Sequence, residues 1–438
     1  MLQTLLICVL ISFAQSVDVH KTIVVSKRIF NPNGYPRQVI SVQEEGVPQD
    51  FPFPGPLLRA TKGDKMYITY KNLLDTSMSI HCHGIHMHNN PWMDGVTGIT
   101  ECGIAPGDSF TYVFNLTQTG TYWYHDHSHT MYGDGLFGPI IIDYPPSETD
   151  PVRVDYPYKQ EHVIMMQDWM HESTADLMAL YKGPYGSYPG FQPKYPWPTT
   201  SLLINGRGSF NCTFENCPLV ANTTDICETL PQCVPVRPPL FGECNTDAHP
   251  MHQFECPTDE YVRLRLINAG VNLSLRFWID RHSLVIVARD GVEVKYVSVT
   301  NVTVAIGQRI DVIVKCDQDD NYRYVMNVAP SSRNTNPKNL TTSALLVYGN
   351  ATQVRDPLAA EFQSDVYFEY KELVPKIKVE SLPAVERLVI VYNTAYTTKP
   401  GFPLDEWVLN NESFIYPSEP LLPAYWQGKR QNNCFFSN

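Results

Sequence analysis

The sequence predicts an all-β fold built from tandem β-sandwiches. Val, Ile, Tyr, Phe and Thr recur in short alternating runs, and 35 Pro and 25 Gly provide turns between them. Apolar residues make up 43% of the 438 residues, which is enough for sizeable cores. At about 100–200 residues per domain, this length favours two to four domains. Two long segments are each sufficient for a sandwich that buries alternating residues between two sheets.

The start of the chain predicts a secretory signal peptide over residues 1–17. An apolar run of about ten residues precedes small or polar residues near Ala14 and Ser16. Neither this run nor any other reaches the roughly 20 residues that span a bilayer, so we expect no transmembrane segment. Eight Asn-x-Ser/Thr sequons fit a secreted, glycosylated surface. They begin at Asn115, Asn211, Asn222, Asn272, Asn301, Asn339, Asn350 and Asn411.

The charge pattern argues against nucleic acid as a partner. The formal net charge is −12. Phosphate backbones are held by clustered Lys and Arg, and the sequence contains no such cluster.

Residues 19–146 are expected to form the first unit. It contains the β-like runs "KMYITYKN", "SFTYVFNL", "GTYWYH" and "GPIIIDY", separated by Gly, Pro and Asp turns. A Pro-rich, acidic link, "YPPSETDPVRVDYPY", closes the unit.

Residues 160–352 are expected to form the second unit, with a cysteine-rich insertion. Its strand-like runs include "HVIMMQDWMH", "YVRLRLINAG" and "IGQRIDVIVKC". Six cysteines fall within 45 residues, a density that predicts disulfides whose pairing the sequence leaves open. They are Cys212, Cys217, Cys227, Cys233, Cys244 and Cys256.

Residues 366–438 differ from the two units before them. They offer two strand-like runs, "VERLVIVYNTAY" and "EWVLNNESFIY". Two strands cannot close a core alone. We therefore expect the partial third domain of a longer architecture, whose body is absent from these residues.

Histidines are concentrated in two patches of the first unit. Seven of the thirteen lie between residues 81 and 129, in "SIHCHGIHMH" and "YWYHDHSH". Residues two apart on a strand share a face, so His81 with His83, and His125 with His127, each present two imidazoles together. If the two strands are neighbours, four imidazoles converge. An all-nitrogen set suits Cu, Zn, Fe or Ni rather than Ca or Mg.

The surrounding motifs resemble the N-terminal copper-binding region of the multicopper oxidases, the family of laccases, ascorbate oxidase and ferroxidases. H-x-H-G, W-M-D-G-V, P-G-x-S-F-x-Y and G-T-Y-W-Y-H-x-H follow in order. The second unit resembles the family's middle domain through "DWMH", "LLINGRG" and "RLRLINAG", and "LDEWVLNNESF" resembles the start of its third. The resemblance implies tandem cupredoxin-like Greek-key sandwiches, two complete and a third partial.

The resemblance also implies a copper cofactor and assigns ligands. His81 would bind the type 2 copper, and His83, His125 and His127 the paired type 3 coppers. In the family these ions form a trinuclear cluster that reduces dioxygen to water with electrons from a small reducing substrate, and bound metal ions suit such successive one-electron steps.

Other local candidates fit the metal site less well. His86 and His88 follow Gly84, where the strand is expected to end, and His129 lies beyond the family motif; we interpret all three as loop residues. Cys82 should point away from the metals, because neighbouring strand residues alternate faces, and we interpret it as a small apolar replacement. "CNTDAHPMH" places His249 five residues after Cys244 but lacks the histidines that flank the cysteine of a type 1 copper site.

The family pattern is incomplete in this sequence. No histidine follows His282, whereas the resemblance implies four further trinuclear ligands and a type 1 copper site in the third domain. We therefore expect no substrate oxidation by the isolated chain, and interpret it as a truncated isoform or incomplete gene model of a secreted, laccase-like oxidase.

Several hypotheses about the function are compatible with the sequence. A complete enzyme would oxidise phenols, aromatic amines or Fe(II), between which the sequence does not choose. A second hypothesis is a non-catalytic, secreted copper-binding or partner-binding protein on the same scaffold. A third, a zinc hydrolase, lacks an evident general-base Glu beside the histidines.

Overall fold

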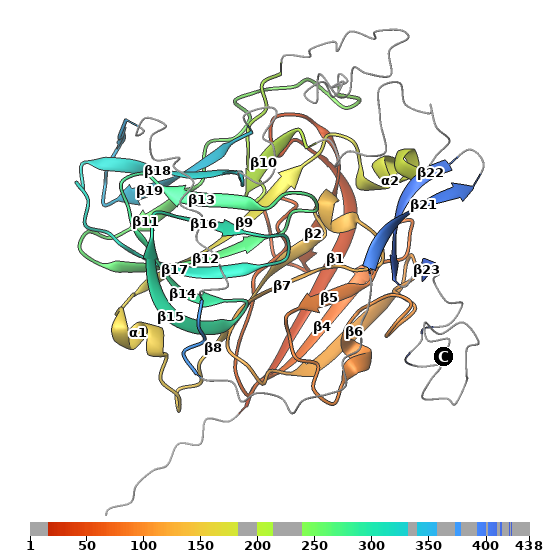
Figure 1. The fold of residues 1–438 in the computed structure, drawn as a ribbon, viewed down its shortest axis with the longest axis horizontal. Coiled ribbons are helices and arrows are strands. Elements are labelled where there is room, and N and C mark those ends of the chain that lie inside the picture. The colour runs from red at the N-terminus through yellow and green to blue at the C-terminus, as the bar shows by residue number, and fades with distance from the viewer. Residues whose placement is uncertain are drawn as a thin grey trace, which may run out of the picture.

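The computed structural model describes residues 16–182, 199–212, 239–331, 340–356 and 373–377, together with the strands at 392–399, 402–409 and 412–413 and residues 420 and 422. The predicted signal peptide lies almost entirely outside these ranges. The described part is built mainly of strands (Figure 1). Within it, no helix combines the length and apolar character needed to cross a membrane.

The first sandwich pairs two four-stranded sheets, ordered β2-β1-β4-β6 and β3-β8-β7-β5. Alternation in the sequence produces it: every second residue of β4, from Met66 to Asn72, is buried. The strands are β1 (Asp18–Phe30), β2 (Arg37–Glu44), β3 (Leu58–Thr61), β4 (Lys65–Asn72), β5 (Ile80–His83), β6 (Ser109–Asn115), β7 (Gly120–Asp126) and β8 (Phe137–Asp143).

The second sandwich pairs a six-stranded sheet, β10-β9-β12-β17-β14-β15, with a second sheet, β11-β19-β18-β13-β16, to which β20 adds. A single apolar core lies between them. The strands are β9 (Gln160–Trp169), β10 (Ser201–Ile204), β11 (Gln253–Cys256), β12 (Tyr261–Asn268), β13 (Leu275–Ile279), β14 (Leu284–Arg289), β15 (Val292–Val299), β16 (Asn301–Val304), β17 (Arg309–Lys315), β18 (Tyr322–Pro330), β19 (Thr342–Tyr348) and β20 (Gln353–Val354).

Short helices occupy the connections. The link between the sandwiches carries α1 (Pro151–Asp155), which Asp150 caps by accepting hydrogen bonds from Val152 and Arg153 N–H groups. A longer helix, α2 (Thr174–Lys182), follows β9, and two 3-10 turns, η1 (Pro91–Met93) and η2 (Met131–Asp134), lie in the first sandwich.

The two sandwiches share a buried apolar cluster, which we call the interface cluster. The first sandwich contributes Val39, Phe53, Trp123 and Phe137, and the second contributes Met165, Trp169, Leu203, Ile267 and Ala269. Burial of this surface holds the two sandwiches together.

The late segment forms a small sheet, β21-β22-β23. Its strands are β21 (Tyr392–Lys399), β22 (Phe402–Leu409) and β23 (Glu412–Ser413), and β22 contacts α2 (Figure 1). Both predicted strand-like runs overlap these strands. That they begin a third domain stays a prediction.

Two disulfides lie within the described residues. Cys212–Cys244 closes the base of the predicted cysteine-rich insertion. Cys256, which we grouped with that insertion, instead pairs with Cys316 at the end of β17, 60 residues away. Cys217, Cys227 and Cys233 lie outside the described residues.

Candidate metal centre

The two histidine patches lie on neighbouring antiparallel strands. In the register of β5 and β7, His81 is opposite His125 and His83 is opposite Trp123. Side chains directly opposite each other share a face, so the pairing brings the patches together. Within the described residues, β5 is the last strand of its sheet and pairs with β7 alone.

Three of the four predicted ligands converge. One ring nitrogen from each of His81, His83 and His125 lies within 4.8 Å of the others. His127 falls just beyond β7 and is more exposed; its ring centroid is 5.2 Å from that of His81. Its backbone N–H donates to the Ser79 carbonyl at 3.0 Å, which fixes its position beside β5.

Backbone carbonyls orient two of the rings. His81 Nδ1 lies 2.7 Å from the Asp94 carbonyl oxygen, and His125 Nδ1 lies 2.8 Å from the Asp126 carbonyl oxygen. A carbonyl only accepts, so each Nδ1 carries the proton and donates it. In both rings Nε2 is then the nitrogen available to a metal, an arrangement typical of metal-ligating histidines.

Burial favours the neutral form of three of the four imidazoles. It lowers the pKa of His83 to about 3, aided by the nearby Arg309 charge. Burial also lowers the pKa of His125 well below its usual range and lowers the pKa of His127. Neutral imidazole is the form that binds metal, so these three rings need not lose a proton near pH 7.

The chemistry of these donors fits copper. Imidazole nitrogens suit Cu and Zn, and the orienting carbonyls supply the support that such ligands need. His83 Nδ1 and His125 Nε2 are only 3.4 Å apart, so the two rings are close enough to share one ion or two adjacent ions.

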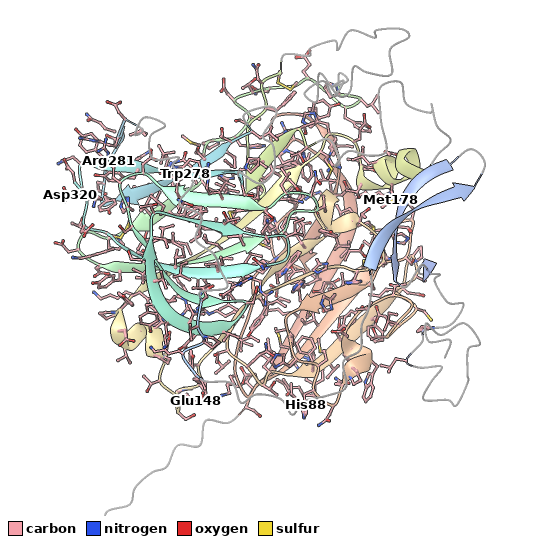
Figure 2. All side chains as sticks on the ribbon, in the orientation of Figure 1. His88, Glu148, Met178, Trp278, Arg281 and Asp320 are labelled. Atoms are coloured by element: carbon pink, nitrogen blue, oxygen red, sulfur yellow. A yellow bond between two sulfur atoms is a disulfide. The ribbon has the colours of Figure 1, made fainter. Side chains whose placement is uncertain are left out.

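The histidines interpreted as loop residues lie outside this group. His86 and His88 are exposed after β5, and Figure 2 places His88 at the margin of the molecule. His129 is exposed, with Nδ1 3.0 Å from Ser128 Oγ. None of the three belongs to the converging set.

Cys82 points away from the histidines, as the sequence predicted, and His249 is not part of the converging group. Cys82 is 1% exposed and packs in the core of the first sandwich, on the face opposite the histidines. Burial raises the pKa of its thiol well above the usual range. His249 Nε2 lies 2.9 Å from the Asn31 carbonyl oxygen, and Cys244 is held in a disulfide, so "CNTDAHPMH" does not form a type 1 copper site.

Sequence reasoning missed the aromatic support of the cluster. Trp123 stacks on His125 with centroids 4.2 Å apart and lies 5.4 Å from His83. Tyr132 from η2 lies 5.3 Å from His125. A signal existed for Trp123, because it stands two residues before His125 and therefore shares its face. None existed for Tyr132.

A titrating carboxyl lies behind β5. Tyr112 Oη donates to Glu101 Oε1 at 2.6 Å and accepts from the Ile80 N–H at 3.1 Å. Burial raises the pKa of Glu101 from an ordinary 4.5 to about 7.

We expect this shift to lower stability as pH rises from about 4.5 to 7. In that window the folded chain keeps a proton that the unfolded chain has lost, so the slope is negative and at most about 1.4 kcal/mol per pH unit. Glu101→Gln, which cannot titrate, should flatten the slope in urea unfolding measured at several pH values. An unchanged slope would exclude Glu101 as its source.

Two sequence profiles described as Multicopper oxidase match this chain, over residues 25–147 and 160–351. Together they cover most of both sandwiches and the whole histidine cluster. The chain belongs to the multicopper oxidase family. Membership implies copper as the cofactor, which agrees with the donor set described above.

Curated relatives of this multicopper oxidase include Laccase-1 of Cryptococcus neoformans, 32% identical over 295 residues that cover 67% of this chain and 41% of the relative. L-ascorbate oxidase of Brassica rapa is 31% identical over 380 residues, covering 84% of this chain and 61% of the relative. The chain therefore spans about half the length of these curated relatives.

Solved structures show the same fold. A laccase from Botrytis aclada aligns with a TM-score of 0.71 and 27% identity, covering 94% of this chain and 67% of the laccase. A multicopper oxidase that functions in iron import aligns with a TM-score of 0.69 and 21% identity, covering 92% of this chain and 66% of that protein. The predicted all-β, cupredoxin-like class is confirmed.

Proposed function

We propose that His81, His83, His125 and His127 supply half of the ligands of a trinuclear copper centre. His81 would hold the type 2 copper, and the other three the type 3 pair. The convergence of three ring nitrogens within 4.8 Å is the observation that carries the proposal. His127 lies outside the group of three, with its ring centroid 5.2 Å from that of His81, and we assign it to a neighbouring ion.

The protein's own contribution is to hold and orient the imidazoles. The carbonyls of Asp94 and Asp126 hold the rings of His81 and His125 with Nε2 free to bind a metal. The Trp123 ring stacks on His83 and His125. Copper, when bound, supplies one-electron redox chemistry toward dioxygen.

The activity we propose is that of a laccase-like oxidase, coupling one-electron oxidation of phenols, aromatic amines or Fe(II) to reduction of dioxygen to water. These 438 residues contain no histidine after His282. The type 1 copper site and the other trinuclear ligands would therefore have to come from sequence beyond them. The partial coverage of the curated relatives supports this proposal.

A second candidate is a non-catalytic, secreted protein that binds copper or a partner on the same scaffold. The missing histidines favour it if the chain functions as given. Sequencing the transcript beyond Asn438 discriminates between the two: a continuation containing H-C-H supports the oxidase, and a verified stop supports the non-catalytic protein.

Secretion is part of both candidates. The leader-like start of the sequence supports it. Three of the sequon asparagines, Asn115, Asn211 and Asn350, are exposed and therefore accessible to glycosylation.

The test is to express the full chain with its leader in eukaryotic cells and collect it from the medium. Dialysis against Cu(II) or Zn(II), metal analysis and electron paramagnetic resonance (EPR) should show retained copper. Oxygen uptake with a phenol or with Fe(II) should not exceed that of metal-free protein. A protein that does not reach the medium would contradict secretion, and retention of zinc in preference to copper would contradict the proposed metal. Blue absorption together with substrate turnover would show that these 438 residues contain copper ligands beyond the four proposed histidines.

A further inference from the structure

The second sandwich reaches the histidine cluster through the turn between β16 and β17. Residues 305–308 form this turn, which we call the β16–β17 turn, and Arg309 is the first residue of β17. Strand β17 contacts β7 across the boundary between the sandwiches (Figure 1). The turn therefore lies close to the histidine cluster, whose imidazoles all belong to the first sandwich.

Gly307 packs directly against the His83 ring. A Cβ placed on Gly307 would lie 3.0 Å from His83 Cε1 and 3.6 Å from Nε2. Glycine is also required by its φ of +75°, which other residues rarely adopt. Trp123 stacks on the same ring at 5.4 Å. His83 is thus confined by one residue from each sandwich.

The turn cannot easily move away from His83. Gly307 N–H donates to the Asn268 carbonyl at 2.9 Å, and Asn268 N–H donates to the Gln308 carbonyl at 3.1 Å. Asn268 is fully buried, and its side-chain amide donates to the Leu273 and Val304 carbonyls. The turn is therefore fixed to the core of the second sandwich.

Arg309 ties this turn to the first sandwich. Its Nε donates to the Thr121 carbonyl at 3.1 Å, and its Nη1 donates to the Gly307 carbonyl at 3.1 Å. The side chain is 4% exposed and pairs with Asp290 at 3.2 Å. Its Nη2 would be 2.4 Å from a Cβ on Gly84, the residue after His83, so the guanidinium fills the space behind that backbone.

We infer that the β16–β17 turn of the second sandwich is the positioning element for His83, with Gly307 as the wall of its ring and Arg309 as the anchor of the turn. This inference rests on the proposed copper-binding role of His83. It makes the geometry of the histidine cluster depend on both sandwiches, although the clustered imidazoles all come from the first.

The test uses Gly307→Ala and Arg309→Lys in the full chain. The alanine methyl would push the His83 ring, and lysine keeps the charge of Arg309 but loses its two-pronged hydrogen bonding. Each variant should bind Cu(II) about tenfold more weakly in titrations followed by EPR, with an altered spectrum, since loss of support around a ligand typically costs 10–100-fold in affinity. In metal-free protein, the rate at which diethyl pyrocarbonate modifies His83 should differ from that of wild type in both variants and be faster in Arg309→Lys, as mapped by mass spectrometry.

Gly46→Ala is the matched control. Gly46 has a φ of +76°, equal strain for alanine, but no atom lies within 4 Å of the added Cβ. The control should match wild type. Wild-type affinity, spectrum and modification rate in both test variants would overturn the inference. If the wild-type protein binds no copper, the proposed function fails, and the metal-free modification rate alone still decides whether the turn positions His83.

Discussion

The double variant His83→Ala, His127→Ala is expected to lose copper uptake almost completely. It removes two of the four imidazoles, one inside the converging group and one beside it. Loss of a supporting partner alone costs 10–100-fold in metal affinity, so loss of two direct ligands should exceed about 100-fold. Equilibrium dialysis with Cu(II), followed by metal analysis, measures the change.

The control for this variant is His86→Ala, His88→Ala. It also removes two histidines, but from the exposed loop after β5. Copper retention should equal that of wild type. Equal loss in both double variants would mean that copper binds histidines nonspecifically, and retention in the His83, His127 variant would refute the proposed ligand set.

A second large effect is expected from Asp134→Ala. Asp134 accepts a hydrogen bond from Arg37 Nη1 at 2.7 Å, and both side chains are less than 10% exposed. It also accepts from the Thr174 backbone N–H at the start of α2, while the Arg37 guanidinium lies 3.9 Å from the Trp169 ring centre. The pair thus joins the first sandwich to elements of the second.

Removing Asp134 leaves the Arg37 charge buried without its partner. Loss of one member of a buried ion pair typically costs 3–5 kcal/mol. Urea unfolding followed by tryptophan fluorescence should show this loss, with the transition shifted to lower urea. Glu45→Ala breaks the exposed Lys71–Glu45 pair and should cost about 1 kcal/mol or less. Equal shifts for both variants would show that burial of the Arg37 pair has no special weight.

Local periodicity made the histidine cluster predictable. Spacing by two residues put His81 with His83 on one face of a strand, and the same rule sent Cys82 into the core. The rule could not give the register that sets His81 opposite His125. Nor could it show that His127 lies beyond the end of β7, because strand ends depend on turns and tertiary contacts.

Contacts between residues far apart in the sequence could not be predicted from the sequence. Cys256 was grouped with its neighbours in sequence, but the parallel alignment of β11 with β19 and the course of β17 bring it to Cys316. Gly307 lies more than 200 residues from His83 in the sequence. A glycine just before a strand predicts a turn but gives no sign of what that turn contacts. Both contacts follow from how the sandwiches pack, which local pattern does not encode.

The interface cluster has a consequence for anyone dissecting this protein. Trp123 belongs to that cluster and also stacks on His125. Expressing the N-terminal half alone would uncover Val39, Phe53 and Phe137 to water and remove the packing that holds the indole. A minimal copper-binding fragment, or a chimera with a foreign middle domain, should therefore retain the apolar residues of this cluster from both sandwiches.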